Sequence, residues 1–144
     1  MTGHHQIDAS TILEAAARIE PYIHHTPVFT SRTINHLLQA EVFFKCENFQ
    51  KVGAFKARGA TNAVLSLDAT LLKCGVATHS SGNHAQALAR AASLVNTKAY
   101  IIMPENSSRI KVDAVKDYGG IITFCEPTLE ALETTLAKIL NQTG

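Results

Sequence analysis

The second half of the chain repeats one pattern: a short apolar run, a turn, and then a longer segment whose apolar positions recur with helical spacing. We expect strands and helices to alternate at 75–78, 83–95, 99–103, 108–118, 121–125 and 128–141. In the last segment, five apolar side chains fall on one helical face: Leu129, Leu132, Leu136, Ile139 and Leu140. Alternation of this kind indicates an α/β fold, with a parallel sheet and flanking helices.

The first half is patterned less regularly. A helix is expected at 8–20, because apolar residues recur on one of its faces. Asp8 or Thr11 can cap this helix, and Thr11 with Glu14 fits a capping box. The remaining expectations are a polar tail at 1–7, a short helix at 30–39 with Ile34, Leu37 and Leu38 inward, a strand at 41–47 and a helix at 55–67.

Length and composition are those of an ordinary globular chain. Its 144 residues carry a net charge of +1 and are 46% hydrophobic, with the charged side chains scattered. No basic stripe points to nucleic acid, and no apolar run points to a membrane. Three widely spaced cysteines, Cys46, Cys74 and Cys125, are typical of reduced thiols in a cytoplasmic protein. His79 and His84 do not share a helix face, so we expect no transition-metal site.

One lysine stands at the junction between an expected strand and an expected helix. Lys56 follows Phe55 and precedes an Ala-Arg-Gly run. Partial shielding from water and nearby backbone N–H groups would favour the free amine, which is the nucleophile that forms a Schiff base with a carbonyl cofactor. On this stretch alone, a solvated loop lysine is the better interpretation. Arg58 is expected to form a structural ion pair, and Gly59 to permit close helix packing.

A second stretch, residues 78–86, also follows an expected strand and opens an expected helix. Ser80, Ser81 and Gly82 let the backbone turn tightly, and Asn83 and His84 begin the helix. The N–H groups at such a helix start favour a bound anion. The alternative is that both serines only cap the helix and that His84 is a surface residue.

Together and in this order, the two motifs resemble those of the serine racemase and serine/threonine dehydratase family. Its members are pyridoxal-phosphate (PLP) enzymes of the tryptophan-synthase-β-like fold. The family pattern is Ser-Phe-Lys-x-Arg-Gly, followed after the next strand by Ser-Ser-Gly-Asn-His, and this chain departs from it only at Ala54. The likeness also covers 26–28, 43–47, 118–120 and 125–127, so it extends over nearly the whole chain.

The resemblance implies roles for both motifs. Lys56 would hold PLP as a Schiff base and act as a base at the substrate Cα, with Phe55 either near the cofactor or in the core. Ser81 would act on the opposite face, as racemisation requires. Asn83 would bind the ring hydroxyl of PLP. The substrate carboxylate would be held by Ser80, Ser81, Gly82, Asn83 and His84.

The resemblance implies an activity but leaves its exact form open. The reaction would be dehydration of L-serine or L-threonine to a 2-oxo acid and ammonia, racemisation of serine, or both. In the family, a glycine-rich loop for the PLP phosphate, the residue facing the pyridine nitrogen and the acidic ligands of a divalent cation such as Mg²⁺ lie downstream, and this chain has no such loop. Full-length relatives are expected to be homodimers. The alternative hypothesis is a catalytically inactive α/β module that binds a partner subunit.

The resemblance also implies how the chain is divided into domains. We expect residues 1–74 to begin the large PLP domain and residues 75–144 to form most of a small α/β domain, as in an N-terminal fragment. In the family, apolar side chains such as Ile12, Ile19, Phe43 and Phe44 would pack on a large-domain sheet. Without that sheet, we expect fast hydrogen exchange before about Leu67 and protection concentrated after residue 75.

Overall fold

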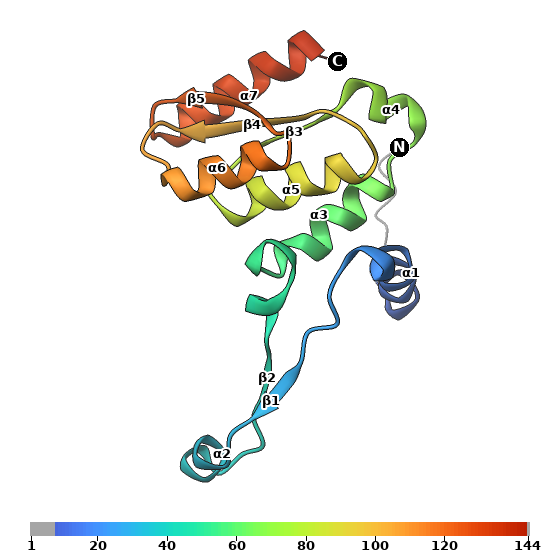
Figure 1. Ribbon diagram of the computed structural model, residues 1–144, viewed down its shortest axis with the longest axis vertical. Coiled ribbons are helices and arrows are strands. Elements are labelled where there is room, and N and C mark those ends of the chain that lie inside the picture. The colour runs from blue at the N-terminus through green and yellow to red at the C-terminus, as the bar shows by residue number, and fades with distance from the viewer. Residues whose placement is uncertain (1–7, 144) are drawn as a thin grey trace.

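A three-stranded parallel sheet organises the second half of the chain (Figure 1). The structure is a computed structural model that describes residues 8–143, so the tail expected at 1–7 lies outside it. The strands are β3 (Val76–His79), β4 (Ala99–Pro104) and β5 (Ile121–Cys125), with β4 in the middle. Thr78 pairs with Ile101, and Ile101 pairs with Ile122. The predicted α/β fold with a parallel sheet is confirmed.

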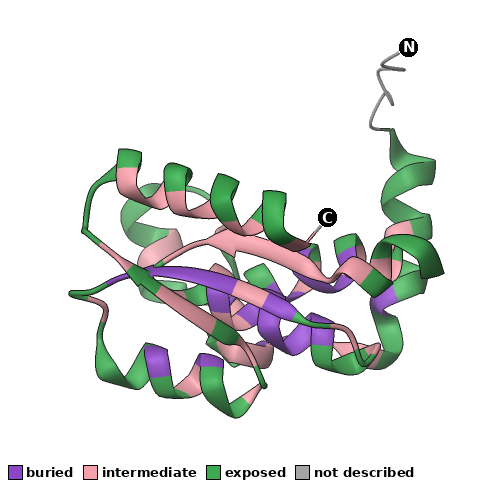
Figure 2. Ribbon diagram, turned by 90° about the horizontal axis from the view of Figure 1, so that it is seen from above, coloured by how far each residue is buried: buried purple, intermediate pink, exposed green. Residues whose placement is uncertain are grey.

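Helices cover both faces of this sheet. α5 (Asn83–Leu94) and α6 (Arg109–Asp117) lie on one face, and α7 (Leu129–Thr143) lies on the other (Figure 1). The side chains of β4 alternate to match, because Ile101 and Met103 join the core that includes α5 while Ile102 is buried outside that cluster. Burial is concentrated in β4 and α5 (Figure 2). Every predicted end in this half lies within two residues of the observed one.

Helix α3 (Lys56–Leu65) belongs to the same core. Its Ala60 and Val64 are buried in the cluster that contains the α5 alanines, because small side chains let the two helices approach closely. A short helix that the pattern did not predict, α4 (Ala69–Cys74), connects α3 to β3. The core therefore includes residues before and after 75, and the division into 1–74 and 75–144 stays a prediction.

Helix α1 (Ala9–Ile19) begins with a capping box. The Asp8 carboxylate accepts a hydrogen bond from the Thr11 N–H (2.9 Å), and the Thr11 hydroxyl oxygen accepts one from the Asp8 N–H (3.2 Å). The predicted box of Thr11 with Glu14 is therefore wrong, because the helix starts before Thr11 and Asp8 occupies the cap position.

Only one large apolar residue of α1 is buried. Ile19 is 6% exposed, whereas Ile12 and Leu13 are 60% and 69% exposed. A 3₁₀ turn, η1 (Glu20–Tyr22), follows α1. Arg90, a buried residue of α5, donates a hydrogen bond from Nη2 to the Tyr22 carbonyl oxygen (2.6 Å). This bond joins the N-terminal segment to the helix that covers the sheet.

An arm, residues 28–45, stands away from the rest of the chain (Figure 1). It consists of β1 (Val28–Thr30), α2 (Arg32–Leu38) and β2 (Phe43–Lys45), and its two strands pair antiparallel. The strand expected at 41–47 is thus only three residues long, and β1 was not predicted. The prediction that Leu37 and Leu38 face inward is wrong, because they are 78% and 58% exposed, and Ile34 is only half-buried.

Two glycines end α6, as the sequence predicts. Gly119 has a φ of +77°, which side-chain-bearing residues rarely adopt, and the Gly120 N–H donates to the Val115 carbonyl oxygen (3.0 Å). A Cβ added to Gly120 would lie 2.6 Å from Val115 Cγ1 and 3.3 Å from Ala89 Cβ. The segment after α6 therefore passes too close to the core for any side chain at this position.

Replacing Gly120 by alanine is expected to lower the free energy of unfolding by about 1–3 kcal/mol, because the new methyl group overpacks the core. Gly59→Ala is the matched control. No atom of a neighbouring element lies within 4 Å of the place for a Cβ on Gly59, so its predicted role in close packing is wrong. Alanine there is expected to stabilise the exposed helix position by about 0.5–1 kcal/mol. Urea unfolding measures both changes, and an unchanged midpoint in Gly120→Ala would contradict this account.

Candidate active site

Lys56 is the first residue of α3 and follows two short 3₁₀ turns, η2 (Glu47–Phe49) and η3 (Lys51–Gly53). Its side chain is exposed, so residues 8–143 do not supply the shielding from water that the sequence suggested. The Nζ atom lies 5.2 Å from the centroid of the Phe55 ring. Phe55 is 61% exposed, which excludes the interpretation of this ring as a core residue within the described structure.

The loop between β3 and α5 contains the second motif. The Ser80 N–H donates to the Ile102 carbonyl oxygen (3.0 Å), and the Gly82 N–H donates to Ser80 Oγ (3.3 Å). Gly82 is the N-cap of α5 and has no side chain with which to cap it. The two serines therefore do not cap the helix, contrary to the alternative that capping is their only role. Backbone N–H groups in the first turn of α5 remain without a side-chain cap, which suits an anion.

The two motifs lie close enough to influence each other electrostatically. His84, a half-buried residue of α5, has its pKa lowered first by burial, then by the positive charge of Lys56 and then by His79. All three effects favour the neutral imidazole, which has one nitrogen free to accept a proton or a hydrogen bond. Ser81 and Asn83 are exposed on the same loop. The packing of α3 against α5 therefore brings Lys56 and the loop at 80–84 into one region.

Arg58 forms the structural ion pair that the sequence predicts, and its partner is Glu47. Arg58 donates from Nε and Nη2 to the two carboxylate oxygens of Glu47, at 2.9 and 2.8 Å. Hydrogen bonds from Arg58 outweigh the cost of burial and lower the pKa of Glu47 to about 2, with further contributions from the Thr26 hydroxyl and the charge of Lys45. Bidentate pairing with a guanidinium favours the ionised carboxylate.

This ion pair gives a pH dependence that can be measured. Because the pKa of folded Glu47 lies below its ordinary value of 4.5, its stabilisation is complete above about pH 5 and is lost as the pH falls towards 2. The contribution is at most about 3 kcal/mol, and less where solvent screens the pair. Urea unfolding of wild type and Glu47→Gln should differ most at pH 7, and the difference should shrink steadily as the pH falls from about 5 towards 2. A difference that does not change with pH would contradict this assignment.

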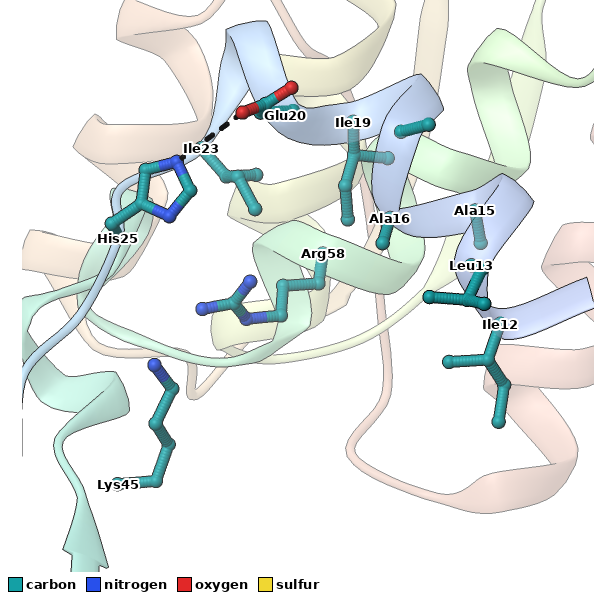
Figure 3. A pocket seen from close by; sticks show the side chains of 11 residues that line it. Ile12, Leu13, Ala15, Ala16, Ile19, Glu20, Ile23, His25, Lys45 and Arg58 are labelled. Carbon is teal, nitrogen blue, oxygen red and sulfur yellow. Dashed lines mark ion pairs between the residues drawn. The ribbon is translucent and has the colours of Figure 1, made fainter. Parts of the chain in front are cut away.

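A groove of about 650 Å³ lies away from Lys56 and from the loop at 80–84. The apolar side chains of α1 and its continuation face Arg58 and Lys45 across it, and His25 Nε2 lies 3.9 Å from Glu20 Oε1 at its edge (Figure 3). Neither Lys56 nor the loop at 80–84 lines it. The chemistry-bearing residues are therefore on the surface of α3 and α5, and not in this groove.

Among residues 8–143, no three His, Cys, Asp or Glu side chains gather where they could hold a metal ion. None of the helices in this part of the chain combines the length and the apolar composition needed to cross a membrane.

Comparison with known proteins gives consistent matches. The profile of the family described as pyridoxal-phosphate dependent enzyme matches residues 19–144. A serine racemase of Dictyostelium discoideum is 50% identical over 131 residues, which are 91% of this chain and 40% of that protein. A β-hydroxyaspartate dehydratase of Paracoccus denitrificans is 51% identical over 133 residues, 92% of this chain and 42% of that protein.

A solved structure of maize serine racemase superposes with a TM-score of 0.91 and 47% identity, covering 95% of this chain and 42% of that one. The chain thus spans about 40% of the length of the curated relatives that it matches.

Proposed function

Because the chain belongs to the pyridoxal-phosphate-dependent enzyme family, we propose that Lys56 holds this cofactor and that the protein acts on a small hydroxyl-bearing amino acid. The reaction is dehydration of L-serine or L-threonine to a 2-oxo acid and ammonia, racemisation of serine, or both. The observation that supports the proposal is that Lys56, at the start of α3, is near enough to His84, at the start of α5, for its charge to lower the pKa of that imidazole. The names of the similar proteins, which include a racemase and a dehydratase, support the same class of substrate.

The residues present fit PLP. Lys56 offers an exposed primary amine for the cofactor carbonyl, and the Phe55 ring lies beside it as an apolar surface. The amide of Asn83, exposed at the first position of α5, would hydrogen-bond the ring hydroxyl. When bound, PLP withdraws electron density from the substrate Cα and so makes its proton removable.

The remaining roles fall to side chains around the amine. Lys56 Nζ would take the Cα proton on one face, and the Ser81 hydroxyl would give or take a proton on the other. Return of a proton from the opposite face inverts serine, whereas departure of the β-hydroxyl leads to the 2-oxo acid and ammonia. The substrate carboxylate would lie against the N–H groups of Ser80, Ser81, Gly82, Asn83 and His84.

A second candidate function is binding of a partner subunit without catalysis. The arm favours it, because Val28, Phe29, Phe43 and Phe44 are each 41% exposed or more. Apolar surface of this extent is typical of contact with another protein surface. Size-exclusion chromatography with a full-length family member tests it. Turnover by this chain alone, without a complex, would rule this function out.

The cofactor proposal is tested by mapping where PLP attaches. The chain is incubated with PLP, treated with borohydride to fix the cofactor on its lysine, digested and analysed by mass spectrometry. We expect the label on Lys56 well ahead of Lys51 and Lys45, which are near in sequence but lie outside the loop region. The urea-denatured chain is the control, in which the label should be distributed equally over these three lysines. Equal labelling of these lysines in the folded chain would reject the proposal.

A further inference from the structure

The segment that carries Lys56 has little regular structure of its own. Between β2 and α3 the backbone makes only two 3₁₀ turns, and Val52 is held at a φ of +55°. A β-branched residue in this region is strained, and such strain persists only where surrounding contacts fix the backbone. The N-cap of α3, Phe55, makes no side-chain capping bond. Other contacts must therefore determine where the first turn of α3 points.

The first of these contacts is made by Arg58, two residues after the lysine. Glu47 accepts both hydrogen bonds from Arg58 and a third from the Thr26 hydroxyl at 2.6 Å. Thr26 is buried, and its carbonyl oxygen accepts a hydrogen bond from Lys45 Nζ at 2.7 Å. Three chain segments that are distant in sequence thus meet at one carboxylate. We call Thr26, Glu47 and Arg58 the carboxylate clamp.

The second contact precedes the lysine. Gln50 is 4% exposed, and its Oε1 accepts hydrogen bonds from the N–H groups of His24 (2.8 Å) and Lys51 (2.9 Å). Its Nε2 donates to the His24 carbonyl oxygen at 2.8 Å. The amide therefore pairs with His24 as a strand neighbour would. This pairing anchors the backbone just before η3 to the segment that follows η1.

We propose that Glu47 is a positioning residue for Lys56, acting through Arg58, while Gln50 fixes the other end of the lysine segment. Successive residues of a helix are about 100° apart, so Arg58 and Lys56 leave α3 on roughly opposite sides. Holding the Arg58 side chain against Glu47 therefore sets the direction in which Lys56 leaves the helix. Ala54 and Ala57 are buried, so they also pack the first turn of α3 against the rest of the protein. The value of such preorganisation rests on the proposed function of Lys56.

Glu47→Gln removes the charge and keeps the shape of the side chain. Asp113→Asn is the matched control, because Asp113 also pairs with an arginine, Arg109 at 3.7 Å, but on exposed α6. Both variants are first compared with wild type by circular dichroism in the far ultraviolet. Amide hydrogen exchange of peptides covering 51–58 is then measured without cofactor, with peptides from 83–94 as the internal reference. The PLP label on Lys56 and the visible circular dichroism per bound cofactor are measured last.

We expect Glu47→Gln to speed exchange in 51–58 at least tenfold with little change in 83–94. It should lower the share of label on Lys56 several-fold and weaken the visible circular dichroism, because the bound cofactor no longer has one orientation. Asp113→Asn should match wild type throughout. Unchanged exchange in 51–58 would overturn the positioning role, whether or not PLP binds. A different outcome is faster exchange in Glu47→Gln while the wild-type chain takes no PLP label on Lys56. That outcome would reject the proposed function, and the clamp would then be only a restraint on the backbone.

Thr26→Val is the milder variant if Glu47→Gln does not fold. It removes only the hydroxyl that donates to Glu47, and the ion pair with Arg58 stays. We expect the same changes in smaller measure. A stability loss without any change in label distribution or in visible circular dichroism would show that the clamp holds the fold and does not orient the lysine.

Discussion

Replacing Lys56 by alanine is expected to abolish the visible absorption band of bound PLP completely. Covalent attachment needs a primary amine, and Lys56 is the lysine of the motif that this chain shares with the family pattern. Lys56 is exposed, and its substitution removes no buried contact. The fold should therefore persist, so that loss of the band reports on chemistry alone.

Two further variants make this result specific. Lys56→Arg keeps the positive charge but cannot form the bond, so it should also lose the band. Lys51→Ala, five residues upstream, should keep it. A band that survives in Lys56→Ala at wild-type intensity would mean that PLP attaches elsewhere and that the family motif in this chain does not hold the cofactor.

Hydrogen exchange along the chain is expected to differ by about a thousandfold or more between the core and the arm. Ile101, Met103 and Val115 are fully buried, and opening this core requires global unfolding, which typically costs about 5–15 kcal/mol. In the arm, Phe43 is 65% exposed and Phe29 54%. Each full burial of such a side chain is worth roughly 1.5–3 kcal/mol, and the arm gains little of it.

The structure also moves the expected boundary between fast and slow exchange. The sequence places it near Leu67, whereas the buried Ala57, Ala60 and Val64 predict slow exchange throughout α3. Peptides from 28–45 should exchange close to the rate of unfolded chain, and peptides from 56–65 with those of α5. Mass spectrometry of quenched samples from dilute monomer measures both. Equal protection in the arm and the core would contradict this prediction, because it would mean that the apolar side chains of the arm are buried in solution.

The regular half of the fold could be predicted because each of its elements has a strong period and a clear stop. Pro104 ends β4, Gly119 ends α6, and the leucines of α7 repeat with helical spacing. The arm could not be predicted equally well. β1 has only three residues and exists through its pairing with β2, and no local signal distinguishes it from a loop. The inward direction assumed for Leu37 and Leu38 presupposed a core that the arm does not have.

The candidate site divides in the same way. Both motifs are contiguous in sequence, so Lys56 and the loop at 80–84 could be found from the motifs together and from their resemblance to a known family. The contacts that hold Lys56 in place could not, because Thr26 and Glu47 lie 32 and 11 positions from Arg58. Sequence reasoning did predict an ion pair for Arg58, but not its partner. A buried glutamine between two 3₁₀ turns gave no signal of its own.

The order of the strands in the sheet has a consequence for how the chain folds. Since β3, β4 and β5 follow one another in the chain and lie side by side in that order, each strand docks beside the one just completed. Each closure spans a single helix, and the entropy lost on closing loops of that size is modest. Contacts between near neighbours in sequence favour rapid folding. During synthesis, the sheet could therefore assemble strand by strand as the chain leaves the ribosome, with α7 covering its second face last.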